Sequence, residues 1–582
     1  MTLDPTEIAS SWLQSYAACL ASGDVKGAVS CFQDTGFLRD LLVFTWNNRT
    51  LHGHEKINAY LENTLAHASI TDLKLESRRG LVPEIDRFNA QLVSSAAHTV
   101  SAGFTFLCKV GRGRGYFFLV PVDAGGWKAI SVMMQLADIS GHEEWIQEEG
   151  AHAGHTLSWT DVNRERREII EKDPYVLIIG AGHTGLNAAA QFKHLNIPSL
   201  VVESNMRIGD NWRKRRVLPQ TYLDIYCELL YHPYPTSWPL YLPRDKIADW
   251  LEHYAQAEDL VVWTNSRPLP CPTYDRTSGR WTVLRELLGE PNIPIMDNRD
   301  TFDGPIVHCV DYKGGKPFAG KRVVVVGAGN TSADLCQDLS FHGAESVTMV
   351  QRSASLVIPI ALVQNLVENM YPEELEIDTC DFLVMAKPVP LIQEMADRTE
   401  ALLVEQLKET YQPLREAGFK LVTNKNLFTV FYSTYGGGHT STVPSRNLCL
   451  LASLMTGYFY DVGCVDLIRS GKVKVKQGVK IARLEKNSVI FTDGSTLEAD
   501  AIVLATSFGS IRDSMRGIFG DSVIDQTSPV WGLDDEGELR GIYRPSGHPG
   551  LWFAAGEFYT SRARAKHLAL EIKAVQLGLL KL

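Results

Sequence analysis

The sequence predicts an α/β protein in which two Rossmann-like dinucleotide-binding domains follow an α+β domain. Two observations predict this order. A β-type apolar run leads into a glycine turn twice, at Gly180 and at Gly327, and no such pattern occurs before about residue 145. With 582 residues the chain is too long for a single core, since soluble domains have roughly 100 to 200 residues each. Hydrophobic and charged fractions of 45% and 21% are typical of a folded, soluble protein.

The net charge and the cysteine pattern indicate which partners and which cellular compartment to expect. A formal charge of −11 provides no basic surface for phosphate backbones, so we expect no nucleic-acid partner. The ten cysteines are scattered without zinc or CxxC spacing, which predicts reduced thiols and no metal site. The first ten residues lack a signal-peptide pattern, and no apolar run reaches the roughly 18 residues of a membrane helix. We therefore expect a cytoplasmic protein without a transmembrane segment.

Residues 1–150 carry no nucleotide motif and predict a separate α+β domain. Asp40, His52 and His54 lie within this part, but we expect turn and surface roles for them rather than a catalytic cluster. The expected elements are helix 8–20, an apolar stretch at 37–42, helix 53–65 and strands at 103–109 and 116–122. This order resembles the nuclear-transport-factor-like (SnoaL-type) cone fold. The resemblance implies a pocket for a small ligand or, equally, a packing or dimerisation module, so a homodimer is possible.

A charged segment at 151–172 predicts a solvated linking helix, and the first nucleotide motif follows it directly. The apolar run 175–179 leads into Gly180, Gly182 and Gly185, and an alanine-rich helical stretch comes next. The first glycine permits a tight turn, the second lets a pyrophosphate approach the backbone, and the third lets the helix pack on the strand. A second strand at 199–202 ends in Glu203, whose carboxylate can accept hydrogen bonds from ribose hydroxyls. Together these features predict a dinucleotide site.

The same pattern occurs again after residue 320. A strand at 321–326 precedes Gly327, Gly329 and Ser332, and the next strand ends near Arg352. A guanidinium can pair with a 2′-phosphate that a carboxylate would repel, so this site is expected to prefer NADPH over NADH. The alternative for Arg352 is a solvated charge at the end of a strand.

Two sites imply two cofactors, and we assign FAD to the first and the hydride donor to the second. Gly209 and Trp212 follow Glu203 closely, so the indole could lie beside the flavin, although a buried core tryptophan is the alternative. The expected boundaries are 173–290 for the first part of the FAD-binding domain, 291–480 for the NADPH-binding domain and 481–582 for the C-terminal part of the FAD-binding domain.

Phe302, Gly304, His308 and Tyr312 reproduce the fingerprint FxGxxxHxxxY just before the second glycine motif. The sequence from about residue 170 to 582 thereby resembles the class B flavin-dependent monooxygenases. Residues 551–556 and 567–570 also resemble this family, in which this region closes over FAD. The resemblance implies a structural role for His308, coupling the two domains around NADP⁺, and no other catalytic residue stands out. Tyr312 resembles the flavin-containing and N-hydroxylating branches, whereas typical Baeyer-Villiger enzymes have Trp there.

The resemblance implies an enzyme, an oxidoreductase of secondary metabolism, that takes a small organic metabolite and O₂ as substrates. In the family, NADPH reduces FAD, and a C4a-(hydro)peroxyflavin transfers one oxygen atom, in N- or S-oxygenation or oxidative decarboxylation. Baeyer-Villiger oxidation of a ketone is the first alternative. A catalytically impaired flavoprotein or an interaction module is the second.

The sequence departs from the family pattern in three places, and the first of them motivates the second alternative. After Val283 the chain passes almost directly to residues 289–294, so a parallel strand of the FAD sheet is expected to be missing. Loss of ladder partners leaves buried backbone groups unpaired, at about 1 to 3 kcal/mol each. An extra segment at 441–455 separates the glycines at 436–438 from Gly457, and Ser507 replaces a family glycine. A misassigned splice in the gene would explain both the deletion and the insertion.

Overall fold

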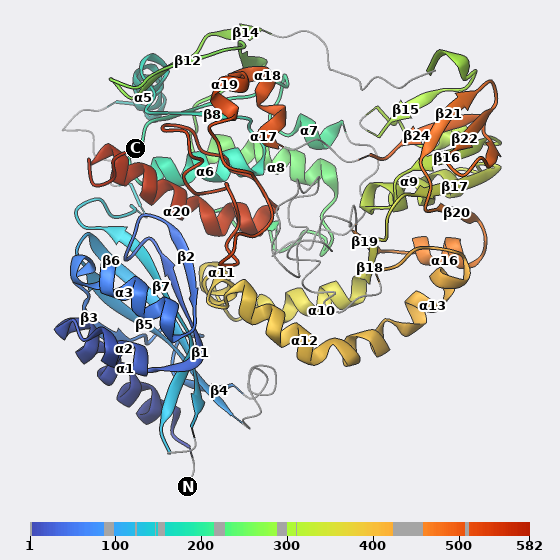
Figure 1. The fold of residues 1–582 in the computed structure, drawn as a ribbon. Helices are drawn as coiled ribbons and strands as arrows, with labels where there is room; N and C mark the ends of the chain where they lie inside the picture. Colours follow the sequence, from blue (N-terminus) through green and yellow to red (C-terminus); the bar gives the residue numbers. More distant parts are fainter. Residues whose placement is uncertain are drawn as a thin grey trace.

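The computed structural model describes residues 3–86, 98–122, 125–145, 147–148, 157–214, 227–287, 299–309, 311–422, 458–506 and 511–582 (Figure 1). Residues 289–294, the glycines at 436–438, the extra segment at 441–455, and Ser507 lie outside this described part. Among the described residues, no helix combines the length and apolarity needed to cross a membrane.

The N-terminal part is a mixed sheet with three helices on one face. The helices are α1 (Pro5–Ser22), α2 (Val25–Ser30) and α3 (His54–Ala68). The strands are β1 (Phe32–Leu41), β2 (Asn48–His52), β3 (Thr71–Leu75), β4 (Glu84–Asp86), β5 (Thr99–Cys108), β6 (Gly111–Pro121) and β7 (Trp127–Ile139). They run in the order β2-β1-β7-β6-β5-β3, with β4 paired to β5, and only β1 and β7 are parallel to each other. The α+β character predicted for this part is therefore present.

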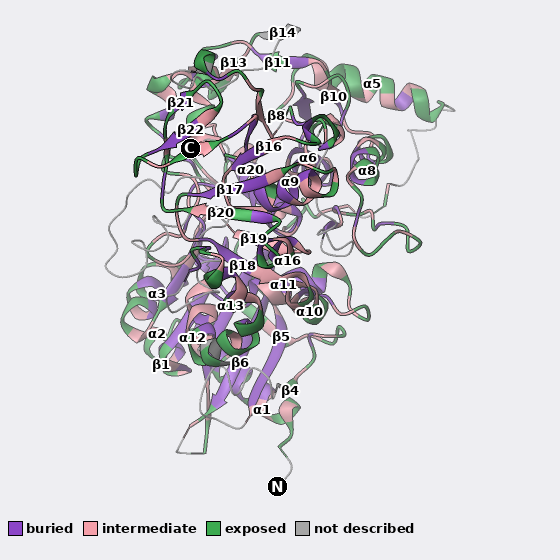
Figure 2. Ribbon diagram, turned by 90° about the vertical axis from the view of Figure 1, so that its right-hand side faces the viewer, coloured by how far each residue is buried: buried purple, intermediate pink, exposed green. Residues whose placement is uncertain are grey.

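Buried residues lie on both faces of this sheet. Leu38 and Val132 belong to the core beneath the three helices, whereas Phe37 and Met133, on the alternate side, belong to a second core. The second core is completed by α11 (Ile377–Met385) and α12 (Val389–Gln406), which come from far along the chain. Figure 2 shows this sheet as largely buried.

The first glycine motif lies in a small parallel sheet with the order β10-β9-β8. Its strands are β8 (Val176–Ile179), β9 (Ser199–Val202) and β10 (Val262–Trp263). Helix α6 (His183–His194) connects β8 to β9, and α8 (Arg244–Ala257) also packs in this unit. The C-terminal helix α20 (Phe558–Gln576) lies along α6 (Figure 1).

The second glycine motif lies in a fully parallel sheet of order β15-β24-β16-β17-β20. Its elements are β15 (Ile306–His308), β16 (Arg322–Val326), α9 (Asn330–Phe341), β17 (Ser346–Gln351), β20 (Val473–Gln477) and β24 (Ala501–Leu504). Three antiparallel strands, β21 (Ile481–Glu485), β22 (Ser488–Phe491) and β23 (Thr496–Glu498), pack against this sheet. Because β24 pairs with β16, the sheet extends beyond the boundary expected at residue 480.

A helical segment joins the two nucleotide-type units to the N-terminal part. In Figure 1, α10 (Ile360–Met370), α11, α12 and α13 (Lys408–Glu416) form an arc below both units. A parallel pair of strands, β18 (Leu356–Pro359) and β19 (Tyr458–Asp461), connects this arc to the second sheet. The predicted linking helix is present as α5 (Trp159–Lys172), and Figure 2 shows it as mostly exposed.

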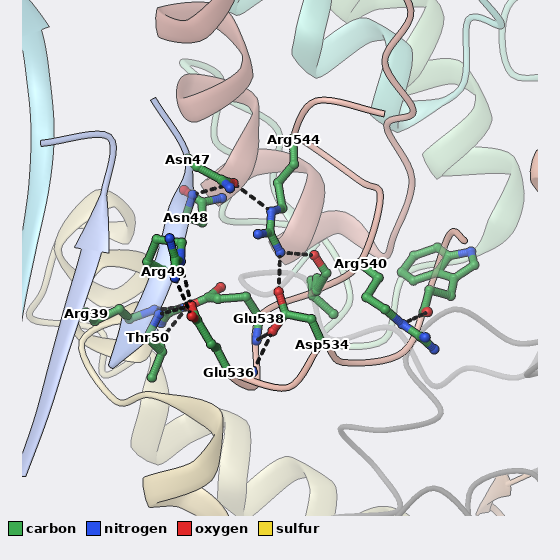
Figure 3. Close-up of polar contacts among 12 residues, drawn as sticks. Arg39, Asn47, Asn48, Arg49, Thr50, Asp534, Glu536, Glu538, Arg540 and Arg544 are labelled. Carbon is green, nitrogen blue, oxygen red and sulfur yellow. Dashed lines mark hydrogen bonds and ion pairs between the residues drawn. The ribbon is translucent and has the colours of Figure 1, made fainter. Parts of the chain in front are cut away.

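Ion pairs join the N-terminal sheet to the loop that precedes α20 (Figure 3). Arg39 of β1 forms a bidentate ion pair with Glu538, through Nε at 2.6 Å and Nη2 at 2.9 Å. Both side chains are almost completely buried. Arg49 of β2 pairs with Glu536, and Thr50 donates a hydrogen bond to Glu538 at 2.8 Å. These ion pairs, of which Arg39–Glu538 is buried, therefore hold the N-terminal part against the C-terminal part.

Candidate nucleotide-binding site

The first glycine turn has the geometry that a dinucleotide loop needs. Gly180 has φ +105°, and an added Cβ there would meet nothing within 4 Å. A Cβ on Gly182 would have only the Asn211 side chain nearby, at 3.9 Å. At Gly185 a Cβ would lie 2.0 Å from the carbonyl oxygen of Gly180, so only glycine lets the helix approach the turn. The first two glycines leave open space and the third permits close packing.

Glu203 is positioned directly after β9 and beside this turn. It is buried, and its Oε2 accepts a hydrogen bond from the backbone N–H of Ala181 at 2.8 Å. Its Oε1 accepts from the backbone and side-chain amide nitrogens of Asn205, at 2.8 and 2.7 Å. The predicted carboxylate is thus held against the glycine turn.

Aromatic rings flank the start of α6. The imidazole of His183 stacks on Phe558 at 4.3 Å between ring centroids, and Phe558 also lies 5.9 Å from the indole of Trp212. Trp212 is in the short helix α7 (Asp210–Arg213) and is buried. Gly209, which precedes it, has φ +85° and packs so closely on Ala248 that a Cβ would lie 2.3 Å from its carbonyl oxygen. Gly209 and Trp212 therefore lie in the same unit as the first glycine turn.

The second glycine turn is more crowded. Gly327 has φ +133°, and a Cβ there would lie 2.5 Å from the carbonyl oxygen of Ala505 and 2.7 Å from Oγ of Ser332. A Cβ on Gly329 would lie 3.5 Å from the carbonyl oxygen of Tyr458. Ser332 occupies the position of the third glycine and is fully buried, and its hydroxyl has no hydrogen-bond partner within the described part of the chain. This loop faces strand β19.

The strand registers identify which residue corresponds to Glu203 in the second unit. The N–H of Gly180 donates to Val202, and the N–H of Gly327 donates to Val350 in the same way. The residue equivalent to Glu203 is therefore Gln351, and Arg352 comes one position later. Sequence reasoning did not single out Gln351, because only the register distinguishes it from its neighbour.

Gln351 is buried, and both ends of its amide are engaged. Its Nε2 donates to the carbonyl oxygen of Lys420 at 2.8 Å, and its Oε1 accepts from the Lys420 N–H at 2.7 Å. Arg352, by contrast, is exposed. The end of β17 thus presents a neutral amide and a cation where the end of β9 presents a carboxylate.

The starts of α6 and α9 each contact a neighbouring segment of the chain. His183 at the start of α6 is hydrogen bonded through Nε2 to the carbonyl oxygen of Gly556 at 2.8 Å. Burial and the carboxylate of the next residue, Glu557, raise the pKa of Tyr458 to about 12. Tyr458 in turn faces Gly329, and Asn330 accepts a hydrogen bond from the N–H of Tyr460 at 2.8 Å. The start of α6 therefore contacts the segment before α20, and the start of α9 contacts β19.

The fingerprint residues lie at the edge of the second sheet. Phe302 is buried, and a Cβ on Gly304 would lie 2.2 Å from the carbonyl oxygen of Asp500, so this glycine is needed for close approach. His308 ends β15 and is in register with Leu504 of β24. Tyr312 is buried, stacks on a phenylalanine ring and donates a hydrogen bond to Asp338 of α9 at 2.7 Å. The fingerprint thereby fastens the incoming chain to the sheet and to α9.

Asp334, one turn after the second glycine motif, is a site residue that sequence reasoning missed. It is 7% exposed, and burial raises its pKa to about 8. It lies in α9 among the buried residues of that helix. Asn330 and Asp338, one turn away on either side, are also polar, so no sequence pattern indicated its burial.

Asp40, His52 and His54 of the N-terminal part do not form a cluster. Asp40 accepts hydrogen bonds from the backbone N–H groups of Val43 and Phe44, at 2.8 and 3.2 Å, and from the hydroxyl of Tyr60 at 2.6 Å. His52 stacks on a phenylalanine ring, and His54 contacts a backbone carbonyl at the start of α3. Asp40 therefore has the turn role that was expected. The described residues contain no group of three or more potential metal ligands.

The donors at both turns fit the phosphates of a dinucleotide. Gly182 and Gly329 are the N-cap residues of α6 and α9, and neither helix has a side-chain cap. Uncapped N–H groups together with the helix dipole form a site for an anion. FAD fits the first turn, where the carboxylate of Glu203 can accept hydrogen bonds from ribose hydroxyls. NADPH fits the second turn.

Comparisons with known proteins find similarity to flavin-dependent monooxygenases. The sequence model of the family described as flavin-binding monooxygenase-like matches residues 288–411. Indole-3-pyruvate monooxygenase YUCCA1 of Oryza sativa subsp. japonica is 28% identical over 379 residues, which cover 62% of this chain and 82% of that protein. The probable indole-3-pyruvate monooxygenase YUCCA9 of Arabidopsis thaliana is 27% identical over 432 residues, covering 70% and 87%.

Solved structures also match. An oxidized steroid monooxygenase bound to NADP matches with a TM-score of 0.43 and 18% identity, covering 69% of this chain and 85% of that one. A complex of OTEMO with FAD and NADP matches with a TM-score of 0.46 and 14% identity, covering 70% and 85%. The sequence matches confirm the prediction of a monooxygenase homologue. The chain is thus similar in sequence to flavin-dependent monooxygenases, and its residues 288–411 match the model of the flavin-binding monooxygenase-like family.

Proposed function

We propose that this protein is an FAD- and NADPH-dependent monooxygenase that transfers one oxygen atom from O₂ to a small organic metabolite. The observation that carries the proposal is the pair of glycine turns, with φ +105° at Gly180 and +133° at Gly327, each of which precedes a helix without a side-chain cap. Bound FAD would activate oxygen, and NADPH would supply the hydride. The residues of the chain would bind the two cofactors, orient them and exclude water.

Each part of the site has its own task in this proposal. Gly180 and Gly182 let the FAD pyrophosphate approach the start of α6, and Glu203 accepts hydrogen bonds from the ribose. The buried rings of Trp212 and Phe558 keep water away from that end of the helix. Arg352 pairs with the 2′-phosphate of NADPH, and the neutral Gln351 removes the repulsion that a carboxylate would cause.

The type of oxygenation is proposed as N- or S-oxygenation or oxidative decarboxylation. Tyr312, whose hydroxyl donates a hydrogen bond to Asp338, supports this choice, because the fingerprint of typical Baeyer-Villiger enzymes has Trp at this position. The similarity to indole-3-pyruvate monooxygenases is also compatible with an organic acid as substrate.

The open edge of β8 favours a second candidate, a flavin-binding protein with impaired catalysis or an interaction module. Among the described residues, β8 pairs only with β9, and Tyr175 and Ile179 are 45% and 38% exposed. The equivalent strand β16 has a parallel neighbour on both sides. The missing neighbour agrees with the strand expected to be absent after Val283.

The cofactor assignment is tested by replacing the cation at the second site. We expect Arg352→Gln to lower the efficiency with which NADPH reduces bound flavin by about 10- to 100-fold, because a charge-assisted contact to phosphate is lost. The efficiency with NADH should stay the same. Lys474→Gln, which removes an exposed cation from the neighbouring strand β20, is the matched control. Equal losses with NADPH and NADH would contradict the role of Arg352.

A further inference from the structure

We infer that the N-terminal domain positions the candidate flavin site through helix α20, with Gln135 and Arg39 as positioning residues. This inference rests on the proposed function, because the site in question is the first glycine turn. It gives the N-terminal domain a role other than dimerisation or ligand binding.

The first end of α20 belongs to the candidate site. Phe558 stacks on His183, the first residue of α6. Three residues later, Ser561 is hydrogen bonded to Thr184, the second residue of α6, with 2.8 Å between the hydroxyl oxygens. The start of α6 is therefore placed by the first turn of α20.

The following turns of α20 belong to the N-terminal domain. The amide nitrogen of Gln135, in β7, lies 2.7 Å from Nε2 of His567. His567 is fully buried, and burial together with the nearby Arg564 and Arg39 lowers its pKa to about 3. Its ring is therefore neutral, so Nε2 accepts the hydrogen bond that the Gln135 amide donates.

A second contact reaches α20 through the loop that precedes it. Nη2 of Arg564 lies 3.5 Å from Oε2 of Glu538, the carboxylate with which Arg39 forms a bidentate ion pair. Arg39 also donates a hydrogen bond to the carbonyl oxygen of Met385, at the end of α11. Although burial alone would raise it, the two guanidinium groups hold the pKa of Glu538 at about 2. A buried carboxylate shared by two cations fixes the spacing between β1 and α20.

The face of the sheet that makes these contacts is covered by the same chain. Arg39, Arg114 and Gln135 lie on one face of the sheet, and Arg114 pairs with Asp378 of α11 at 2.9 Å. The apolar residues between them pack against α11 and α12. A second copy of the chain therefore has no access to this face, and its polar groups serve the contact with α11 and α20.

The test uses the full-length protein and two substitutions of buried hydrogen-bonding groups. Gln135→Leu removes the contact with α20 and keeps a similar volume. Tyr116→Phe is the control, because its hydroxyl bonds Ser101 at 3.0 Å within the same sheet and makes no contact with α20 through that bond. Both variants lose a buried hydrogen bond, so both are expected to lower the unfolding midpoint.

The two variants are expected to differ in readouts that report on the site. In Gln135→Leu we expect the dissociation constant for FAD to rise at least tenfold and the visible spectrum of the bound flavin to shift, and neither change in Tyr116→Phe. Without FAD, the backbone amides at the start of α6 should exchange hydrogen faster in Gln135→Leu alone. Unchanged exchange, or equal changes in both variants, would overturn the inference. Wild-type protein that fails to bind FAD would contradict the proposed function, and the exchange readout would still decide the inference.

Discussion

At the scale of single residues, the glycines of the first motif have separable roles. A Cβ at Gly185 meets the carbonyl oxygen of Gly180 at 2.0 Å, whereas one at Gly182 meets only a side chain at 3.9 Å. The sequence pattern predicted both roles, because a strand, a glycine turn and a helix leave few other geometries. The structure adds the distances that separate a folding role from a binding role.

This separation gives a prediction for two alanine variants. Gly185→Ala should lower the free energy of unfolding by about 1 to 3 kcal/mol, because backbone must shift to admit the methyl group. Gly182→Ala should leave the free energy of unfolding within about 0.5 kcal/mol of wild type. It should nevertheless weaken FAD binding, because the methyl group occupies the space that the pyrophosphate needs. Chemical denaturation and FAD titration measure the two effects, and equal destabilisation by both variants would contradict the assignment.

Other residues at the site could not be predicted from sequence. Arg352 is the cation nearest the end of β17 in the sequence, but the register shows that Gln351 corresponds to Glu203. The pairing of Arg39 with Glu538 joins residues 499 positions apart, and no local pattern encodes it. A buried arginine in a strand is a sign of some partner, yet only the fold identifies which one.

At the scale of elements, periodicity predicted the helices and strands of the N-terminal domain. The expected helix 8–20 lies within α1, the expected helix 53–65 starts at Gly53, the N-cap of α3, and the strands expected near residues 103 and 116 are β5 and β6. The boundary at residue 480 could not be predicted, because β24 returns to the second sheet after the antiparallel strands β21 to β23. Strand pairing across a long insertion leaves no mark in the hydrophobic pattern.

The unequal environments of β8 and β16 give a prediction for hydrogen exchange. Val324 and Val325 of β16 are buried between two parallel neighbours, whereas β8 has one neighbour among the described residues. Peptides that cover β8 should therefore exchange their amide hydrogens at least tenfold faster than peptides that cover β16. Mass spectrometry after timed labelling measures both in one sample. Equal protection would mean that another segment completes the edge of β8.

At the scale of the whole molecule, three parts of the chain meet around α20. Its start contacts the beginning of α6, its middle contacts the N-terminal sheet, and its Arg562 pairs with Asp381 of α11. The cone-like identity of the N-terminal domain remains a prediction from the order of its elements. Its attachment through buried ion pairs indicates that it folds as part of the monooxygenase-like body and not as a loosely tethered module (Figure 3).

The measurement that tests the central claim most directly is the visible absorption spectrum of the purified protein, before and after anaerobic addition of NADPH and then of air. The account predicts a yellow protein whose flavin band is bleached by NADPH and restored by oxygen, because both glycine turns bind their cofactors. A protein that stays colourless after addition of FAD would contradict the account. It would also show that the open edge of β8 prevents assembly of the flavin site.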